Sequence, residues 1–186
     1  VREMIDTARA KPKQLTFASS GTGSSTHLAI ELFKSLAKVE ITHVPFKGGG
    51  PAVIATASGE VNAIINSPAV VLPHVKTGRL RGLAVTSAKR SEIAPDLPAL
   101  AEAGALPGYE VQGWYGVFAP RATPRRIVGA VNAELDRYVQ SSEGRARLLS
   151  FGLTTTGGTP EAFADYYKRE TERWGRIIRA AGIRSD

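Results

Sequence analysis

The first half of the chain alternates between short apolar runs and amphipathic stretches with helical spacing. The apolar runs predict strands at 15–18, 40–44, 62–65 and 83–86. After each of the first three runs, apolar and capping residues are spaced as in helices, which predicts helices at 24–36, 52–57 and 68–76. Strands that alternate with helices favour a mostly parallel sheet covered by helices, so the pattern predicts an α/β fold.

The second half is dominated by helical patterns, as are residues 1–10. A short helix is predicted at 100–103, and an extended aromatic segment at 110–119 includes a strand at 117–119. Further helices are predicted at 124–139 and 142–149, then a strand at 151–155 and a long final helix that begins at Thr159-Pro160. An aromatic stripe along that last helix indicates a packing face, formed by Phe163, Tyr166, Tyr167 and Trp174.

Three of the predicted helices begin in loops whose residues suit helix capping. Ser24 or Ser25 caps the first helix, a glycine before Pro51 caps the second, and Asn66-Ser67-Pro68 opens the third. The first N–H groups of a helix lack partners within it and lie at the positive end of its dipole, so they bind anions. Because each loop follows a strand, we expect all three to face one crevice that holds a carboxylate or another oxyanion. The pocket is predicted around Ser19, Gly23, Ser24, Gly49 and Ser67, with Lys47 as the adjacent cation.

Composition and charge narrow the function classes. The 186 residues suffice for one sizeable domain or two small ones, and the absence of cysteine excludes disulfides and thiolate metal sites. The net charge of +7 is spread, because residues 1–119 hold 12 Lys and Arg against 9 Asp and Glu, and residues 120–186 hold 12 against 8. A nucleic-acid surface gathers its basic residues, so no nucleic-acid partner is expected.

The usual signatures of catalysis and of cofactor binding are missing from the sequence. His27, His43 and His74 form no closely spaced ligand pair, so no metal is expected and each histidine is predicted to pack or cap locally. The glycine-rich loops lack the endings of a P-loop and of a dinucleotide fingerprint, and there is no G-x-S-x-G motif. With no evident nucleophile and base, the sequence favours a binding site that uses no cofactor and catalyses no reaction.

Longer segments of the chain carry a specific resemblance. Residues 17–28, 43–52 and 72–90 closely resemble the receptors of tripartite tricarboxylate transporters, which are the Bug-type periplasmic solute-binding proteins. Shorter matches continue through Asp96–Pro98, Glu102–Gly104, Gly113–Gly116 and Ala119-Pro120 to the final helix, so the resemblance covers essentially the whole chain.

The resemblance implies a type II periplasmic-binding-protein fold, with two lobes of mostly parallel sheet. It also implies that the protein captures a small di- or tricarboxylate, or a related organic acid, between the lobes and delivers it to membrane permease subunits. Family members often have aspartate where this chain has Asn66, which favours plain carboxylates over amino acids. The residues expected to bind ligand are Ser19, Ser20, Gly21, Thr22, Gly23, Ser24, Ser25, His27, Lys47, Gly48, Gly49, Asn66 and Ser67.

The chain departs from the family pattern at its start. The signal peptide and the first half-lobe of family members are missing, so the first lobe is expected to be incomplete and the full-length form to be secreted to the periplasm. Residues 1–11 are predicted to be a crossover helix from the first lobe, 12–112 the second ligand-binding lobe, and 113–186 the returning part of the first lobe. A dimer formed through the incomplete first lobe is a further expectation.

Two other functions use the same crevice. The first is an enzyme on the same fold that acts on a carboxylic substrate, which turnover of a bound carboxylate would favour. The second is a sensory ligand-binding domain that acts on a signalling partner. Neighbouring genes for a small and a large membrane subunit would favour transport over both alternatives.

Overall fold

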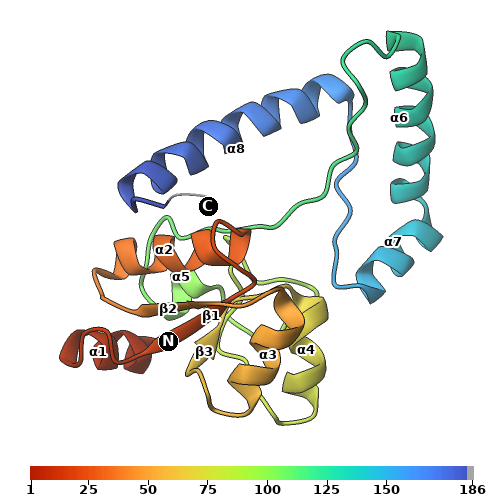
Figure 1. Ribbon diagram of the computed structural model, residues 1–186. Coiled ribbons are helices and arrows are strands. Elements are labelled where there is room, and N and C mark those ends of the chain that lie inside the picture. The colour runs from red at the N-terminus through yellow and green to blue at the C-terminus, as the bar shows by residue number, and fades with distance from the viewer. Residues whose placement is uncertain (184–186) are drawn as a thin grey trace. The chain divides into compact units, whose positions relative to one another are not determined.

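The computed structural model describes residues 1–183, which divide into two compact units (Figure 1). One unit comprises Val1–Gly113 together with the chain from Ile177 onward, and the other comprises Trp114–Arg176. The elements are α1 (Arg2–Ala10), β1 (Thr16–Ser19), α2 (Ser25–Ala37), β2 (Thr42–Pro45), α3 (Gly49–Ala57), β3 (Ala63–Ile64), α4 (Pro68–Lys76), α5 (Leu100–Ala103), α6 (Arg125–Gln140), α7 (Ser142–Ser150) and α8 (Pro160–Ala180).

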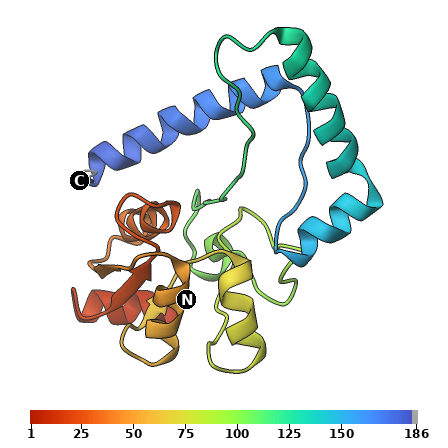
Figure 2. The same ribbon diagram turned by 45° about the vertical axis from the view of Figure 1, so that its right-hand side comes forward.

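The sheet of the first unit has three parallel strands in the order β2-β1-β3. Phe17 of β1 pairs with His43 of β2 on one side and with Ala63 of β3 on the other. Helices α2, α3 and α4 each follow one of these strands, and α2 lies on the opposite side of the sheet from α3 and α4 (Figures 1 and 2). The predicted α/β fold with a parallel sheet is therefore confirmed.

Three predicted strands are wrong. Residues 83–86 contribute only an isolated parallel bridge between Val85 and Ala99, and neither 117–119 nor 151–155 is a strand. A strand needs a neighbour that completes its hydrogen-bond ladder, and no described segment forms a ladder with any of these three. The local apolar pattern indicates extended chain, but strand pairing depends on distant residues, and residues 151–152 form a turn instead.

Helix α3 starts earlier than predicted. Gly48 is the residue that caps it, with φ of 106°, and Gly49 is its first helical residue, which places Pro51 at the third position rather than the first. A positive φ is open to glycine at little steric cost, which is why a glycine precedes this helix.

The core beneath α2 is aromatic. The rings of Phe17 and Phe33 stack at 5.9 Å, and Tyr109 meets the Phe33 ring edge-on at 6.4 Å. The Tyr109 hydroxyl donates a hydrogen bond to the Ala29 carbonyl at 3.1 Å, and burial raises the pKa of Tyr109. This contact joins the chain around residue 109 to the middle of α2, so it fixes the helix that begins at the predicted ligand loop.

The core on the other side of the sheet is built from small side chains. Ala18 of β1 packs against Ala52 and Ala55 of α3 and against Val61, all of them buried. Alanine lets a helix approach a sheet closely, so α3 is held near β1 and its first residues lie beside the end of that strand.

The second unit contains α6, α7 and most of α8. Trp114 makes edge-on contacts with Phe163, Tyr166 and Tyr167, at centroid distances of 5.6, 5.8 and 6.1 Å. Phe118 adds contacts with two of these rings, at 5.4 Å to Phe163 and 5.7 Å to Tyr167. The aromatic stripe of the final helix is thus a packing face, as its spacing predicts.

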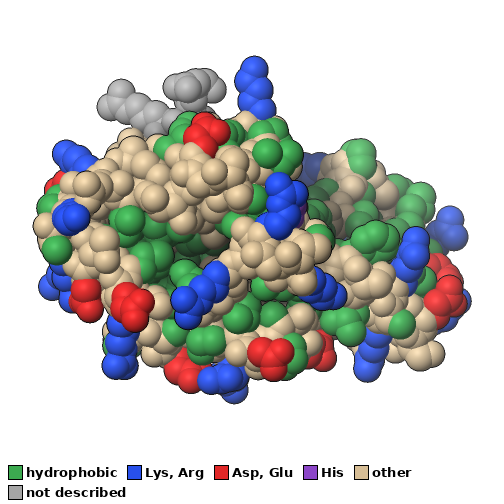
Figure 3. All heavy atoms as spheres, turned by 90° about the horizontal axis from the view of Figure 1, so that it is seen from below, with side chains coloured by type: hydrophobic (Ala, Val, Ile, Leu, Met, Phe, Trp, Pro, Cys, Tyr) green, Lys and Arg blue, Asp and Glu red, His purple; other side chains and the backbone are tan. Residues whose placement is uncertain are grey.

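Charged side chains of both signs are interspersed on the surface seen in Figure 3, where Lys and Arg lie among Asp and Glu. This distribution agrees with the even spread of charge along the sequence.

Truncation of the central aromatic ring should be costly. Phe33→Ala removes a side chain with no exposed surface, and is expected to lower the free energy of unfolding by about 3–5 kcal/mol. Urea unfolding followed by circular dichroism measures this. Ile54 of α3 is 63% exposed, so Ile54→Ala is the control and should change stability by less than about 0.5 kcal/mol. Equal losses in the two variants would contradict the core described above.

Candidate functional site

The loop from Ser19 to Ser25 joins β1 to α2 and is folded back on itself by its own hydroxyl groups. Ser24 is the N-cap of α2: its Oγ accepts a hydrogen bond from the His27 N–H at 3.2 Å and donates one to the Gly21 carbonyl at 2.7 Å. The Ser20 N–H donates to Thr26 Oγ1 at 2.9 Å. Of the two caps that the sequence allowed, Ser24 is therefore the one used.

The loops before α3 and α4 meet the first loop at Ser20. The Gly48 N–H donates to the Ser20 carbonyl at 3.2 Å, and Asn66 Nδ2 donates to Ser20 Oγ at 3.0 Å. The other amide atom of Asn66, Oδ1, accepts from the Ser67 N–H at 2.9 Å. Residues from three separate loops are thus in hydrogen-bond contact at the carboxyl edge of the sheet.

Gly49 fits against this junction because it has no side chain. A Cβ at that position would lie 3.1 Å from both terminal atoms of Asn66 and 3.2 Å from a methyl group of Val70. A Cβ on the next residue, Gly50, would meet nothing within 4 Å. The two neighbouring glycines therefore differ sharply in how much a substitution would disturb the junction.

Each of the three helices begins with N–H groups that have no protein partner. Within the described residues, the N–H groups of Ser25, Thr26, Gly49, Gly50 and Ala69 donate no hydrogen bond. Helix N-termini carry partial positive charge, so donors at three such ends, joined through one junction, form a site suited to an oxyanion.

The remaining predicted ligand residues differ in exposure. Thr22, Gly23, Ser25, Lys47 and Ser67 are exposed, and among the described residues Lys47 makes no ion pair. Ser19, by contrast, has no exposed surface, so its side chain is buried behind the exposed residues of the loop.

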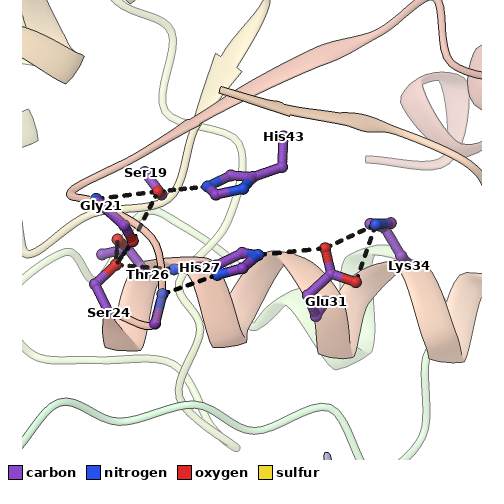
Figure 4. A network of polar contacts seen from close by, with 9 residues as sticks. Ser19, Gly21, Ser24, Thr26, His27, Glu31, Lys34 and His43 are labelled. Carbon is purple, nitrogen blue, oxygen red and sulfur yellow. Dashed lines mark hydrogen bonds and ion pairs between the residues drawn. The ribbon is translucent and has the colours of Figure 1, made fainter. Parts of the chain in front are cut away.

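His27 also lies behind the loop, where it forms a stacked pair with His43 (Figure 4). Their ring centroids are 3.8 Å apart and the ring planes are inclined by 8°. His27 Nδ1 accepts a hydrogen bond from the Gly23 N–H at 3.1 Å, and its Nε2 lies 3.7 Å from Glu31 Oε1. Both ring nitrogens of this predicted ligand residue thus face protein groups.

His43 is a residue of the site region that the sequence did not single out for a role there. Its Nε2 lies 2.6 Å from Ser19 Oγ, which is in turn within 3.2 Å of both the N–H and the carbonyl of Gly21. The sequence signal that could have identified His43 was its place in a predicted strand. Side chains alternate between the two faces of a strand, so its ring was expected to pack against a neighbouring element.

The histidine pair is held in its neutral form by its surroundings. Burial, and then the neighbouring His27, lower the pKa of His43 to about 4. Burial likewise lowers the pKa of His27, although the Glu31 carboxylate opposes the shift. Glu31 is itself paired with Lys34 at 2.7 Å, which weakens its effect on the rings.

The contact between Ser19 and His43 corrects one sequence-based inference. A hydroxyl and an imidazole do lie within hydrogen-bond distance, whereas the sequence showed no paired nucleophile and base. The two residues are 24 positions apart, and only the parallel pairing of β1 with β2 brings them together. A catalytic serine is normally accessible to its substrate, whereas Ser19 is buried and its hydroxyl already contacts the Gly21 backbone.

The described residues contain no group of three or more His, Cys, Asp or Glu placed to hold a metal ion. They also contain no helix with the length and apolar character needed to cross a bilayer.

Comparison with known families decides the identity of the chain. The family model described as the tripartite tricarboxylate transporter family receptor matches residues 1–183. The chain belongs to this receptor family. The resemblance noted in the sequence is confirmed.

Two curated relatives illustrate the match. The receptor chain is 42% identical over 178 residues to the UPF0065 protein in the tcbD-tcbE intergenic region of Pseudomonas sp. strain P51, covering 96% of this chain and 53% of the relative. It is 33% identical over 181 residues to protein BugT of Bordetella pertussis, covering 97% of this chain and 55% of BugT. The receptor chain therefore spans about half the length of these relatives.

Solved structures agree with the fold. R. palustris Rpa4515 with adipate has a TM-score of 0.88 and 38% identity, over 98% of this receptor chain and 61% of that chain. MatC (Rpa3494) from Rhodopseudomonas palustris with bound malate has a TM-score of 0.77 and 31% identity, over 95% and 60% of the two chains. The receptor chain thus shares its fold with proteins whose structures contain a dicarboxylate.

The histidine pair predicts how stability depends on pH. Above the ordinary histidine pKa of 6.5, His43 is neutral in both the folded and the unfolded chain. As the pH falls from 6.5 to about 4, the unfolded chain takes up a proton that folded His43 does not, so the free energy of unfolding decreases.

Urea midpoints measured across this pH range should therefore decline less in His43→Gln than in the unsubstituted protein. His74→Gln, on α4, is the control and should keep the full decline. Parallel declines in the protein and in His43→Gln would show that other groups cause the acid sensitivity.

Proposed function

We propose that this chain is the ligand-binding part of an extracytoplasmic receptor, which captures a small carboxylate and delivers it to the permease of a tripartite tricarboxylate transporter. The observation that carries the proposal is the junction of three loops at Ser20, with unpartnered N–H groups at three helix starts. Adipate and malate in the related structures support a dicarboxylate as the ligand class.

The chemistry of the junction favours anion binding by backbone N–H groups rather than by charged side chains. N–H donors at three helix starts complement the oxygens of a carboxylate, and Lys47 is the nearby cation in sequence. Asn66 is neutral and already donates to Ser20, so it offers no negative charge for the ammonium group of an amino acid. The site is therefore proposed to accept plain organic acids.

The lobe assignment is part of the same proposal. Residues 12–112 would be the second ligand-binding lobe, 1–11 a crossover helix, and 113–186 the returning part of the first lobe. The boundary between compact units after Gly113 supports the division near 112. Location in the periplasm, secretion of the full-length form and contact with permease subunits rest on family membership.

A dimer through the first lobe stays a prediction. The second unit carries exposed apolar side chains on α6, which favour a covering partner: Ile127, Val131, Leu135 and Tyr138 are 40–47% exposed.

One observation favours the rival enzymatic function, namely the 2.6 Å contact of Ser19 with His43. Full burial of Ser19 argues against it, because a nucleophile must reach its substrate. A sensory domain would bind the same ligand, and it is distinguished by its partner rather than by its pocket.

Binding is tested by isothermal titration of the full-length gene product, and of this chain, with adipate, malate and citrate. Gly49→Val places a branched side chain where Asn66 lies, and should weaken dicarboxylate binding by about tenfold or more. Gly129→Val, on α6 and no part of the junction, adds the same group where nothing lies within 4 Å, and should stay within about threefold of the unsubstituted protein. Equal effects at both glycines would place the ligand elsewhere, and an absence of binding to any acid would reject the proposal.

The enzymatic alternative is tested by incubating the protein with each bound acid and following its concentration by NMR. Binding without conversion is expected. Steady turnover that Ser19→Ala abolishes while binding persists would instead establish the Ser19–His43 pair as catalytic.

A further inference from the structure

We propose that the stacked pair of His27 and His43 is a proton-sensitive support of the loop Ser19–Ser25, which holds the loop in its ligand-binding form only while both rings are neutral. The proposal rests on the proposed function for the meaning of that form. It adds regulation by pH, which the carboxylate site itself does not require: the ligand would be released in acid.

Each histidine of the pair holds a different part of the loop. His27 Nδ1 accepts from the Gly23 N–H at 3.1 Å, near the end of the loop. His43 Nε2 contacts Ser19 Oγ at 2.6 Å, and Ser19 in turn contacts Gly21 near the start of the loop. Figure 4 shows both rings beside the loop, one from α2 and one from β2. The loop is therefore tied at both ends to a single stacked unit.

Protonation of His27 is incompatible with its bond to the loop. The Gly23 N–H is a donor, so Nδ1 must carry a lone pair to accept from it. A protonated imidazole has a donor on both nitrogens, which would place two hydrogens between Gly23 and the ring. Uptake of one proton therefore breaks the contact that fixes Gly23, the residue one position before the helix cap.

Protonation of both rings is opposed by their stacking. Centroids 3.8 Å apart and nearly parallel planes would place two like charges face to face, on a buried His27 and a half-buried His43. Since the first proton on either ring disfavours the second, full protonation requires the rings to separate. Separation withdraws support from both ends of the loop together.

The charged neighbours of the two rings give the protonated pair little stabilisation. The charged groups that act on the rings are Glu31 and Lys34, both from α2. Glu31 favours protonation, but Lys34 contacts both of its carboxylate oxygens, at 2.7 and 2.9 Å. Among the sheet residues beside the pair, β1 has no titratable side chain and β2 has only His43 itself.

The direction of the pH effect follows from the two states. Solvated rings in a released loop would have the ordinary pKa of 6.5, whereas burial keeps the paired rings neutral to lower pH, about 4 for His43. Released loop is therefore favoured increasingly as the pH falls from 6.5 toward 4. Carboxylate affinity should decline over the same interval.

The first test measures the loop without any ligand. Amide hydrogen exchange is followed by NMR at about pH 7.5 and about pH 4.5, as protection factors that correct for the chemical exchange rate. Protection at Gly23 is expected to fall by about tenfold in acid while the core amides of Ile30 and Phe33 keep theirs. In His27→Asn/His43→Gln, which retains polar groups that do not titrate in this range, the ratio between the two pH values should be near one.

The second test measures adipate affinity at the same two pH values. Adipate carboxyls also take up protons in acid, so each protein is compared with its own affinity at the higher pH, and the ratios are compared between variants. The unsubstituted protein and the control His74→Gln should lose about tenfold more affinity than the double variant.

Two results would overturn the proposal: unchanged protection at Gly23 in the unsubstituted protein, or the same acid-dependent losses in the double variant. If that variant does not fold, His27→Asn alone is used and should lose most of the effect at Gly23, because its side chain does not take up a proton in this range. An absence of adipate binding at both pH values would reject the proposed function instead, and the exchange measurement would still decide the role of the histidines.

Discussion

The parallel pairing of β1 with both of its neighbours is the constraint on which the site depends. Because β2 and β3 run in the same direction as β1, all three strands end at one edge, and the helices that follow them begin there. Small side chains bring α3 close to β1, and the Tyr109 hydroxyl fixes α2 through Ala29. Packing on the two sides of the sheet thus sets the distance between helix ends that are far apart in sequence.

At that edge the protein satisfies some backbone groups and leaves others open. Ser24 caps α2 with its hydroxyl group. Ser20 joins the other two loops, because its hydroxyl accepts a hydrogen bond from the Asn66 side-chain amide and its carbonyl accepts one from the Gly48 N–H. Among the described residues, the N–H groups of Ser25, Thr26, Gly49, Gly50 and Ala69 stay without protein partners. The first N–H groups of a helix bond to water or to a ligand when no cap accepts from them, and those at these three helix starts are the basis of the proposed anion site.

Behind the loops the same edge contains a polar layer of uncommon composition. Two stacked imidazoles, a buried serine and the Glu31–Lys34 pair lie where an apolar core would give more stability. The rings stay neutral because burial disfavours their charged form, and neutrality is what lets His27 accept from Gly23. Stability of the loop is therefore linked to proton concentration through residues that need not touch the ligand.

The sequence by itself determined the parts that depend on neighbouring residues: the order of the first three strands and helices, a serine cap at Ser24 or Ser25, a glycine cap before Pro51, and the family. It could not determine which extended segments pair, so 83–86, 117–119 and 151–155 were wrongly predicted as strands. Nor could it show that His43 stacks on His27 and reaches Ser19, because those contacts join residues 16 and 24 positions apart through strand register. Capping and turn chemistry act over a few residues, whereas pairing, burial and pKa depend on what the fold brings alongside, and only the tertiary structure decides that.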